Sequence, residues 1–219
     1  MIAAAAMRDK QTAERRARVD RAIEVLAVAL LGIATVGSAW CGYQASKWNG
    51  EESKEARASA SARIDASRLF SLGVQQVAYD ASVTAQYAGA VAGGNERLQA
   101  FIKQNLVRPP YLPVLEKWEA QIAAGQSQGG IFQNQAYLDA QLAPSREAEA
   151  RDAAAAAKAE EASSTSDDYV LAALIMASAL FFSGVTTSFR TTGVRLALLA
   201  TATLVIAVAG ARIADLPIA

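Results

Sequence analysis

Two long stretches without a charged side chain limit what this chain can fold into. Val25 to Ser46 covers 22 residues and Tyr169 to Phe189 covers 21. Both exceed the length of about 18 apolar residues that marks a candidate transmembrane helix. The first is also longer than the apolar region of about 7–15 residues in a secretory signal peptide. We therefore predict membrane-spanning helices over residues 25–46 and 169–189.

A third apolar segment follows near the end of the chain. Leu196 to Ala211 covers 16 uncharged residues, and Arg195 and Arg212 flank it. Because long arginine side chains reach from a buried backbone to the polar interface, we predict a third span over residues 193–213, with a short tail over 214–219. The alternative for so short a segment is a re-entrant or interfacial helix.

The positions of basic residues predict how the spans are oriented. The first 24 residues contain six Lys or Arg, and Arg190 and Arg195 lie at the turn between the second and third spans. Basic residues close to spans stay on the cytoplasmic side. We therefore expect a basic cytoplasmic tail over residues 1–24 and an extramembrane insert, residues 47–168, on the outside. Four basic residues just after the first span reduce the difference in basic residues between the two sides: Lys47, Lys54, Arg57 and Arg63.

The insert has the composition of a helical segment. No proline occurs in it before Pro109. Apolar and small residues recur in its first half at spacings of three and four, which is typical of a helix that packs along one stripe. This predicted stripe consists of Phe70, Val74, Val77, Ala81, Thr84, Ala88 and Val91.

These features predict the course of the chain through the insert. The first span continues as one helix to about Ala92, and the run Gly93-Gly94-Asn95 ends it. Two short helices follow over residues 96–107 and 114–124, and an alanine-rich return leg leads into the second span. The predicted fold class is all-α: three transmembrane helices with a long antiparallel helical stalk or bundle inserted between spans one and two.

Composition argues against several classes of function. Histidine is absent, the net charge is zero and there is a single cysteine, Cys41. The commonest general base and metal ligand are therefore missing, and a neutral chain gives no electrostatic case for nucleic acid. No charged residue lies in the central part of any span, where transporters usually need one. We expect no enzyme, no cofactor and no metal site.

Two groups of residues are candidates for an interaction surface. The first lies where span one leaves the membrane: Trp40, Tyr43, Gln44, Trp48 and Asn49. It is either an aromatic belt at the interface or a polar pocket that binds another span or subunit. The second lies on a helical face next to the predicted stripe and consists of Tyr79, Val83 and Tyr87. It either contacts a partner or lies under the two short helices.

Two stretches resemble the signature stretches of an uncharacterised family. They are residues 39–53, Ala-Trp-Cys-Gly-Tyr-Gln-Ala-Ser-Lys-Trp-Asn-Gly-Glu-Glu-Ser, and residues 168–184, which begin Asp-Tyr-Val-Leu-Ala-Ala-Leu. The family consists of bacterial three-pass membrane proteins with an alanine-rich helical insert between spans one and two. The tail ending Leu-Pro-Ile-Ala is also similar. The resemblance implies a bacterial plasma membrane and this layout, and it carries no catalytic residues.

Three hypotheses for function remain open at this point. The first is a membrane-anchored helical interaction or scaffold protein whose partners are the lipid bilayer and another copy or membrane protein. The second is a periplasmic sensor in which the proline-broken end of the insert binds a ligand. The third is a subunit of an oligomeric pore, although all three spans are strongly apolar.

Overall fold

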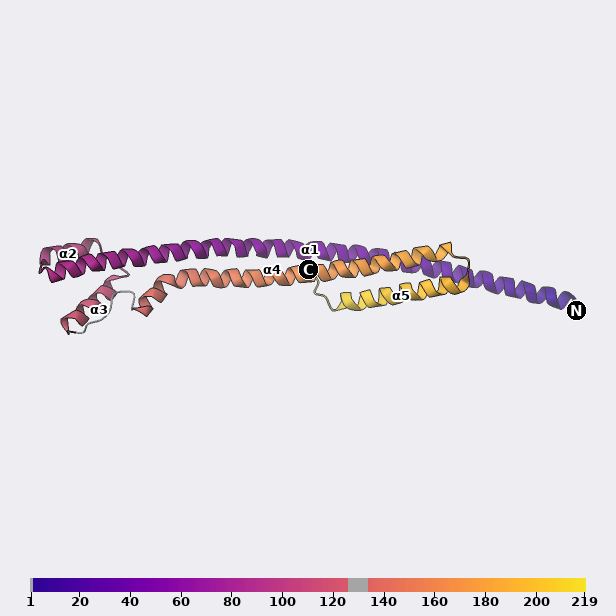
Figure 1. The fold of residues 1–219 in the computed structure, drawn as a ribbon. Coiled ribbons are helices and arrows are strands. Elements are labelled where there is room, and N and C mark those ends of the chain that lie inside the picture. Colours follow the sequence, from indigo (N-terminus) through magenta and orange to yellow (C-terminus); the bar gives the residue numbers. More distant parts are fainter. Residues whose placement is uncertain (1, 126–133) are drawn as a thin grey trace. The chain divides into compact units, whose positions relative to one another are not determined.

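The regular structure in this computed structural model, which describes residues 2–125 and 134–219, is helical (Figure 1). Three helices are long and apolar enough to cross a membrane. They contain the predicted spans 25–46 and 193–213, and the helix over the second predicted span, 169–189, ends at Ser188. The expected all-α class is therefore confirmed; the part of the insert over 126–133 lies outside the described residues. The helices are α1 (Ile2–Ala92), α2 (Glu96–Asn105), α3 (Leu112–Ala123), α4 (Gln135–Val185) and α5 (Thr192–Ala214), with a 3₁₀ turn at Thr186–Ser188.

The end of α1 follows local sequence signals. Gly94 adopts a φ of 65°, a left-handed conformation that favours glycine. The Asn95 N–H donates to the carbonyl of Ala90 at 3.0 Å, as in a Schellman-type helix end. The Asn95 side chain then accepts a hydrogen bond from the Leu98 N–H and caps α2. The predicted end at Ala92 and the predicted cap are both confirmed.

The chain forms two compact units, and α1 and α4 contribute to both. The three-helix unit consists of residues 1–55 and 157–219, and the insert unit consists of residues 56–156. The insert unit therefore begins about nine residues later than the predicted insert, inside the uninterrupted helix α1.

The three-helix unit is packed through small and aliphatic side chains. One buried cluster joins Ile23, Ala27 and Leu30 of α1 to Leu199 and Ala202 of α5. A second joins Cys41 and Ala45 of α1 to Tyr169 and Ala172 of α4. Cys41 is fully buried, as expected for a small packed residue. The guanidinium of Arg195 donates to Asp20 at 2.9 Å, so an ion pair ties the start of α5 to α1.

In the insert unit α1 and α4 run antiparallel. Tyr137 bonds to Asp80, the backbone at Gly73 lies against that of Gln141, and Asp152 accepts bonds from Ser59 and Arg63. The residue number on α4 rises as that on α1 falls, which fixes the direction of the pair. Figure 1 shows α4 bending close to its first turns, and Pro144, which lacks an N–H for the helical ladder, lies in this part of the helix.

The buried stripe of α1 differs from the predicted one. Phe70, Val74 and Val91 are 48%, 47% and 39% exposed, so their assignment to the stripe is wrong. The return helix presents small buried residues such as Ser145, Ala148 and Ala155. Small residues on both helices let the backbones approach, and the large side chains are left on the flanks. The observed stripe consists of Ser59, Ala62, Ala66, Gly73, Val77, Asp80, Val83, Tyr87 and Ala90.

Gly73 marks the closest approach of the two helices and supports a first prediction. A Cβ at this position would lie 2.8 Å from the carbonyl oxygen of Gln141, which belongs to the backbone and cannot rotate away. We expect Gly73→Ala to destabilise the insert unit by about 1–2 kcal/mol, because overpacking outweighs the gain in helix propensity. The measurement is a urea titration of the purified full chain in mild detergent, followed by far-UV circular dichroism.

A matched glycine provides the control for this prediction. A Cβ on Gly89 would meet no atom within 4 Å. Gly89→Ala should therefore stabilise helix α1 by about 0.5–1 kcal/mol through propensity alone. Equal effects of the two substitutions would contradict close packing at Gly73.

Candidate functional site

The predicted partner surface on the insert is largely internal. Val83 is 2% exposed and Tyr87 is 6% exposed, so their assignment to an outer surface is wrong. The alternative, in which the short helices cover this face, describes the structure. Both residues lie in a core with Ile102 of α2, Leu115 of α3 and Tyr137 of α4, together with Val77, Ala90 and Tyr111. Only Tyr79 of that trio keeps an exposed side chain.

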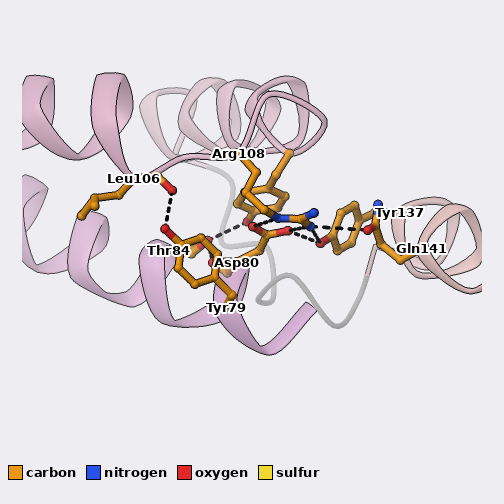
Figure 2. Close-up of polar contacts among 8 residues, drawn as sticks. Tyr79, Asp80, Thr84, Leu106, Arg108, Tyr137 and Gln141 are labelled. Atoms are coloured by element: carbon orange, nitrogen blue, oxygen red, sulfur yellow. Dashed lines mark hydrogen bonds and ion pairs between the residues drawn. The ribbon is translucent and has the colours of Figure 1, made fainter. Parts of the chain in front are cut away.

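An ion pair is buried within this unit. Asp80 on α1 has no exposed surface. Arg108 lies in the segment between α2 and α3. Its guanidinium donates two hydrogen bonds to the Asp80 carboxylate, one from Nε at 2.9 Å and one from a terminal nitrogen. The hydroxyl of Tyr137 on α4 donates to the same carboxylate. Figure 2 shows these three side chains converging from separate segments. This bidentate ion pair, together with the tyrosine donor, satisfies the Asp80 carboxylate, whose charge would otherwise be costly to bury.

Further hydrogen bonds extend the cluster around Asp80. The Tyr79 hydroxyl donates to the carbonyl of Leu106 at 2.9 Å (Figure 2). The hydroxyls of Thr84 and Tyr111 are 2.6 Å apart. The terminal nitrogen of Arg108 also lies 3.4 Å from the side-chain oxygen of Gln141. The cluster thus fastens the α2–α3 connection and α4 to one stretch of α1.

A second charged group joins α2 to α3. Lys103 donates to the Glu119 carboxylate at 2.8 Å and lies 3.7 Å from Glu116. Burial, together with the neighbouring Glu119 carboxylate, raises the pKa of Tyr87 to about 12. Burial also raises the pKa values of Tyr111 and Tyr137, and the bonded Asp80 adds to the effect on Tyr137.

These raised pKa values predict how stability depends on pH. The folded insert favours the neutral form of these tyrosines. Their contribution to the free energy of unfolding is therefore complete below the ordinary tyrosine pKa of about 10, and it is lost as pH rises towards about 12. We expect the unfolding temperature of the full chain to fall over this range. Tyr87→Phe should make the fall shallower. Identical pH profiles for the original protein and this variant, measured by circular dichroism, would contradict the assignment.

In the three-helix unit, Gln44 and Trp48, which belong to the predicted group at the exit of span one, contact the tail of the chain. The Trp48 indole nitrogen and the Tyr169 hydroxyl both donate to the carbonyl of Pro217, each at 3.1 Å. Gln44 is 1% exposed, and its side-chain oxygen accepts the N–H of Ala219 at 3.1 Å. Residues from α1, α4 and the tail therefore meet at one point.

The other predicted residues at this exit lie elsewhere. Trp40 and Tyr43 are exposed and their rings lie 6.0 Å apart, whereas Gln44 is buried. Asn49 is also exposed. The outward rings have the character of an interfacial aromatic belt, while Gln44 and Trp48 serve internal packing against the tail.

Several residues of these clusters were absent from the predicted sites, although the sequence contains a signal for one of them. Asp80 is the only charged residue between Arg68 and Glu96. A lone acid in an otherwise uncharged helical stretch indicates a buried and paired position. Nothing local identifies Arg108 and Tyr137 as its partners, because they lie 28 and 57 residues further along the chain.

No group of three or more His, Cys, Asp or Glu placed to hold a metal ion occurs within residues 2–125 and 134–219. Comparison of the chain with family models, with curated proteins and with solved structures gives no match.

Proposed function

We propose that the chain is a membrane-anchored helical interaction protein whose insert unit binds another protein or a second copy. The observation that carries the proposal is the exposed surface of α1 within that unit. From residue 69 to residue 95 the only charge is Asp80, and its carboxylate is fully buried and paired. The stretch therefore presents no net charge to solvent over about seven helical turns.

Large apolar side chains lie exposed on the same stretch. They are Phe70, Leu72, Val74, Tyr79 and Val91, which we name the uncharged surface of α1. At about 100° per residue, Phe70 and Val74 lie on one flank of the helix, and Leu72 and Tyr79 lie on the other. Single exposed apolar residues are ordinary, but several on one helical stretch with no exposed charge of its own are typical of an interaction surface. The buried ion pair beneath it supports the proposal, since it holds the helices that frame this surface in one arrangement.

A photo-crosslinking experiment in native membranes tests this function. A photoreactive amino acid is placed at Phe70 or Val74 in the full chain, and in a matched control at Ala154, an exposed position on α4. We expect adducts from the first two positions and none from the third, and mass spectrometry then separates a second copy from another protein. Equal labelling at all three positions would overturn the proposal; ion conduction by the purified chain in bilayers would favour the pore.

We further propose a bacterial plasma membrane location with the N-terminus cytoplasmic and the insert outside. The Asp20–Arg195 ion pair supports a shared side for the basic tail and the turn before α5. In a Cys41→Ala background, we expect a cysteine at Ser71 to react with an impermeant thiol reagent in intact cells, and a cysteine at Thr191 to react only after lysis. Both positions are exposed. The reverse pattern would contradict this orientation.

A further inference from the structure

A groove in the three-helix unit lies where α4 and α5 meet the tail. Its walls come from Asp168, Leu171, Ala172 and Ile175 of α4 and from Arg212, Asp215 and Leu216 at the end of α5. Its volume of about 340 Å³ is within the range of about 300–1,000 Å³ found for ligand sites. Asp168 precedes the second predicted span and Asp215 follows the third. The groove therefore lies at the polar boundary of the apolar helices.

The charges in this groove have no partners among the described residues. Asp168, Arg212 and Asp215 are exposed, and none of them forms an ion pair within 4.0 Å in that part of the chain. Leu171 is exposed beside them, Ile175 is half-buried and Ala172 is buried. The groove therefore combines one positive charge, two negative charges and an adjoining apolar wall on α4.

The tail side of the groove is held in place by hydrogen bonds. Leu216 is followed by Pro217, whose carbonyl accepts bonds from Trp48 and Tyr169. Ala219 lies two residues after Pro217, and its N–H donates to the side-chain oxygen of Gln44. Because these bonds fix the tail, the groove is formed before a ligand arrives, which lowers the cost of binding.

We propose that this groove binds one phospholipid with a phosphoethanolamine headgroup. The guanidinium of Arg212 pairs with the phosphate, since arginine matches phosphate geometry with two parallel donors. The carboxylates of Asp168 and Asp215 accept hydrogen bonds from the primary ammonium. One acyl chain lies along Leu171 and Ile175.

The charge pattern selects this headgroup over others that share the phosphate. Two carboxylates repel a headgroup that carries only negative charge, such as phosphatidylglycerol. Phosphatidylcholine has a positive charge but no N–H, so it cannot donate to either carboxylate. A headgroup with one phosphate and one primary ammonium complements the groove in both respects.

Native mass spectrometry of the full chain tests the proposal. The purified protein is titrated in mild detergent with phosphatidylethanolamine, phosphatidylcholine or phosphatidylglycerol with identical acyl chains. We expect phosphatidylethanolamine to bind about tenfold more tightly at the first site, as for a charge-assisted hydrogen bond. Equal affinities for the three lipids, or a preference for phosphatidylglycerol, would overturn it.

Variants at the groove link that preference to its residues. Asp168→Asn with Asp215→Asn should abolish the preference for phosphatidylethanolamine over phosphatidylcholine, and Arg212→Gln should weaken the binding of all three lipids. Asp167→Asn and Arg190→Gln are the matched controls, because both residues are exposed and neither lines the groove. Unchanged preference in the groove variants, with circular dichroism showing intact helices, would assign the lipid to another place.

Discussion

Replacement of Arg108 by methionine is expected to lower the free energy of unfolding of the insert unit by about 3–5 kcal/mol. Asp80 has no exposed surface, so without the guanidinium its charge remains buried with Tyr137 as the remaining side-chain donor. Methionine keeps much of the length and apolar volume of the arginine stem. The loss therefore reports the missing charge rather than a cavity. Urea titration of the full chain, followed by far-UV circular dichroism, measures the change.

Two further variants make this result interpretable. Asp80→Asn combined with Arg108→Met removes both charges and should recover part of the stability lost in the single variant, because no uncompensated ion remains. Arg97→Met changes an exposed arginine on α2 and should alter stability by less than about 0.5 kcal/mol. A loss in Arg108→Met no larger than that in Arg97→Met would show that the pair is not important for the unit.

The features that the sequence predicted well have local causes. Membrane-spanning length follows from consecutive residues, and the end of α1 follows from Gly94 and Asn95, whose conformation and cap lie within a few residues of the break. The short helices were also expected, although Leu112 and Pro113 begin α3 two residues earlier than predicted. Proline is compatible with the first turn of a helix, where its missing N–H has no partner to lose.

The buried stripe of α1 could not be predicted from apolar spacing alone. The spacing of three and four placed Phe70 and Val74 inside and left Val83 and Tyr87 for an outer face. The choice depends on the surface of α4. The backbone of Gln141 comes so close to Gly73 that a side chain there would clash, and the residues that α4 buries further along, such as Ala148 and Ala155, are small. Further along α1, the larger Val83 and Tyr87 meet Ile102 and Leu115 instead.

Long-range polar contacts were also beyond the reach of sequence patterns. Gln44 and Trp48 were identified as unusual, but their partners are backbone groups of Ala219 and Pro217, which have no side-chain signature. The distance along the chain is 175 residues in the first case and 169 in the second. Only the packing of α5 against α1 and α4 brings the tail to this place.

The last prediction separates the core of the insert unit from its uncharged surface. Val83→Asp should destabilise the unit by about 4 kcal/mol or more, because it places an unpaired charge among Tyr87, Ile102 and Leu115. Val74→Asp introduces the same group at a position that is 47% exposed, so its effect should stay below about 1 kcal/mol. Urea titration and limited proteolysis of the full chain distinguish the two.

The same pair of substitutions also connects stability to the proposed function. Val74→Asp puts a charge on the uncharged surface of α1 while the fold persists, so it should abolish crosslinking from Phe70. Val83→Asp should abolish crosslinking only because the unit unfolds. If Val83→Asp left the insert folded and removed the assembly, Val83 would belong to an interface after all. If Val74→Asp left crosslinking unchanged, the uncharged surface would have no part in binding, and the chemistry of this stretch would serve folding alone.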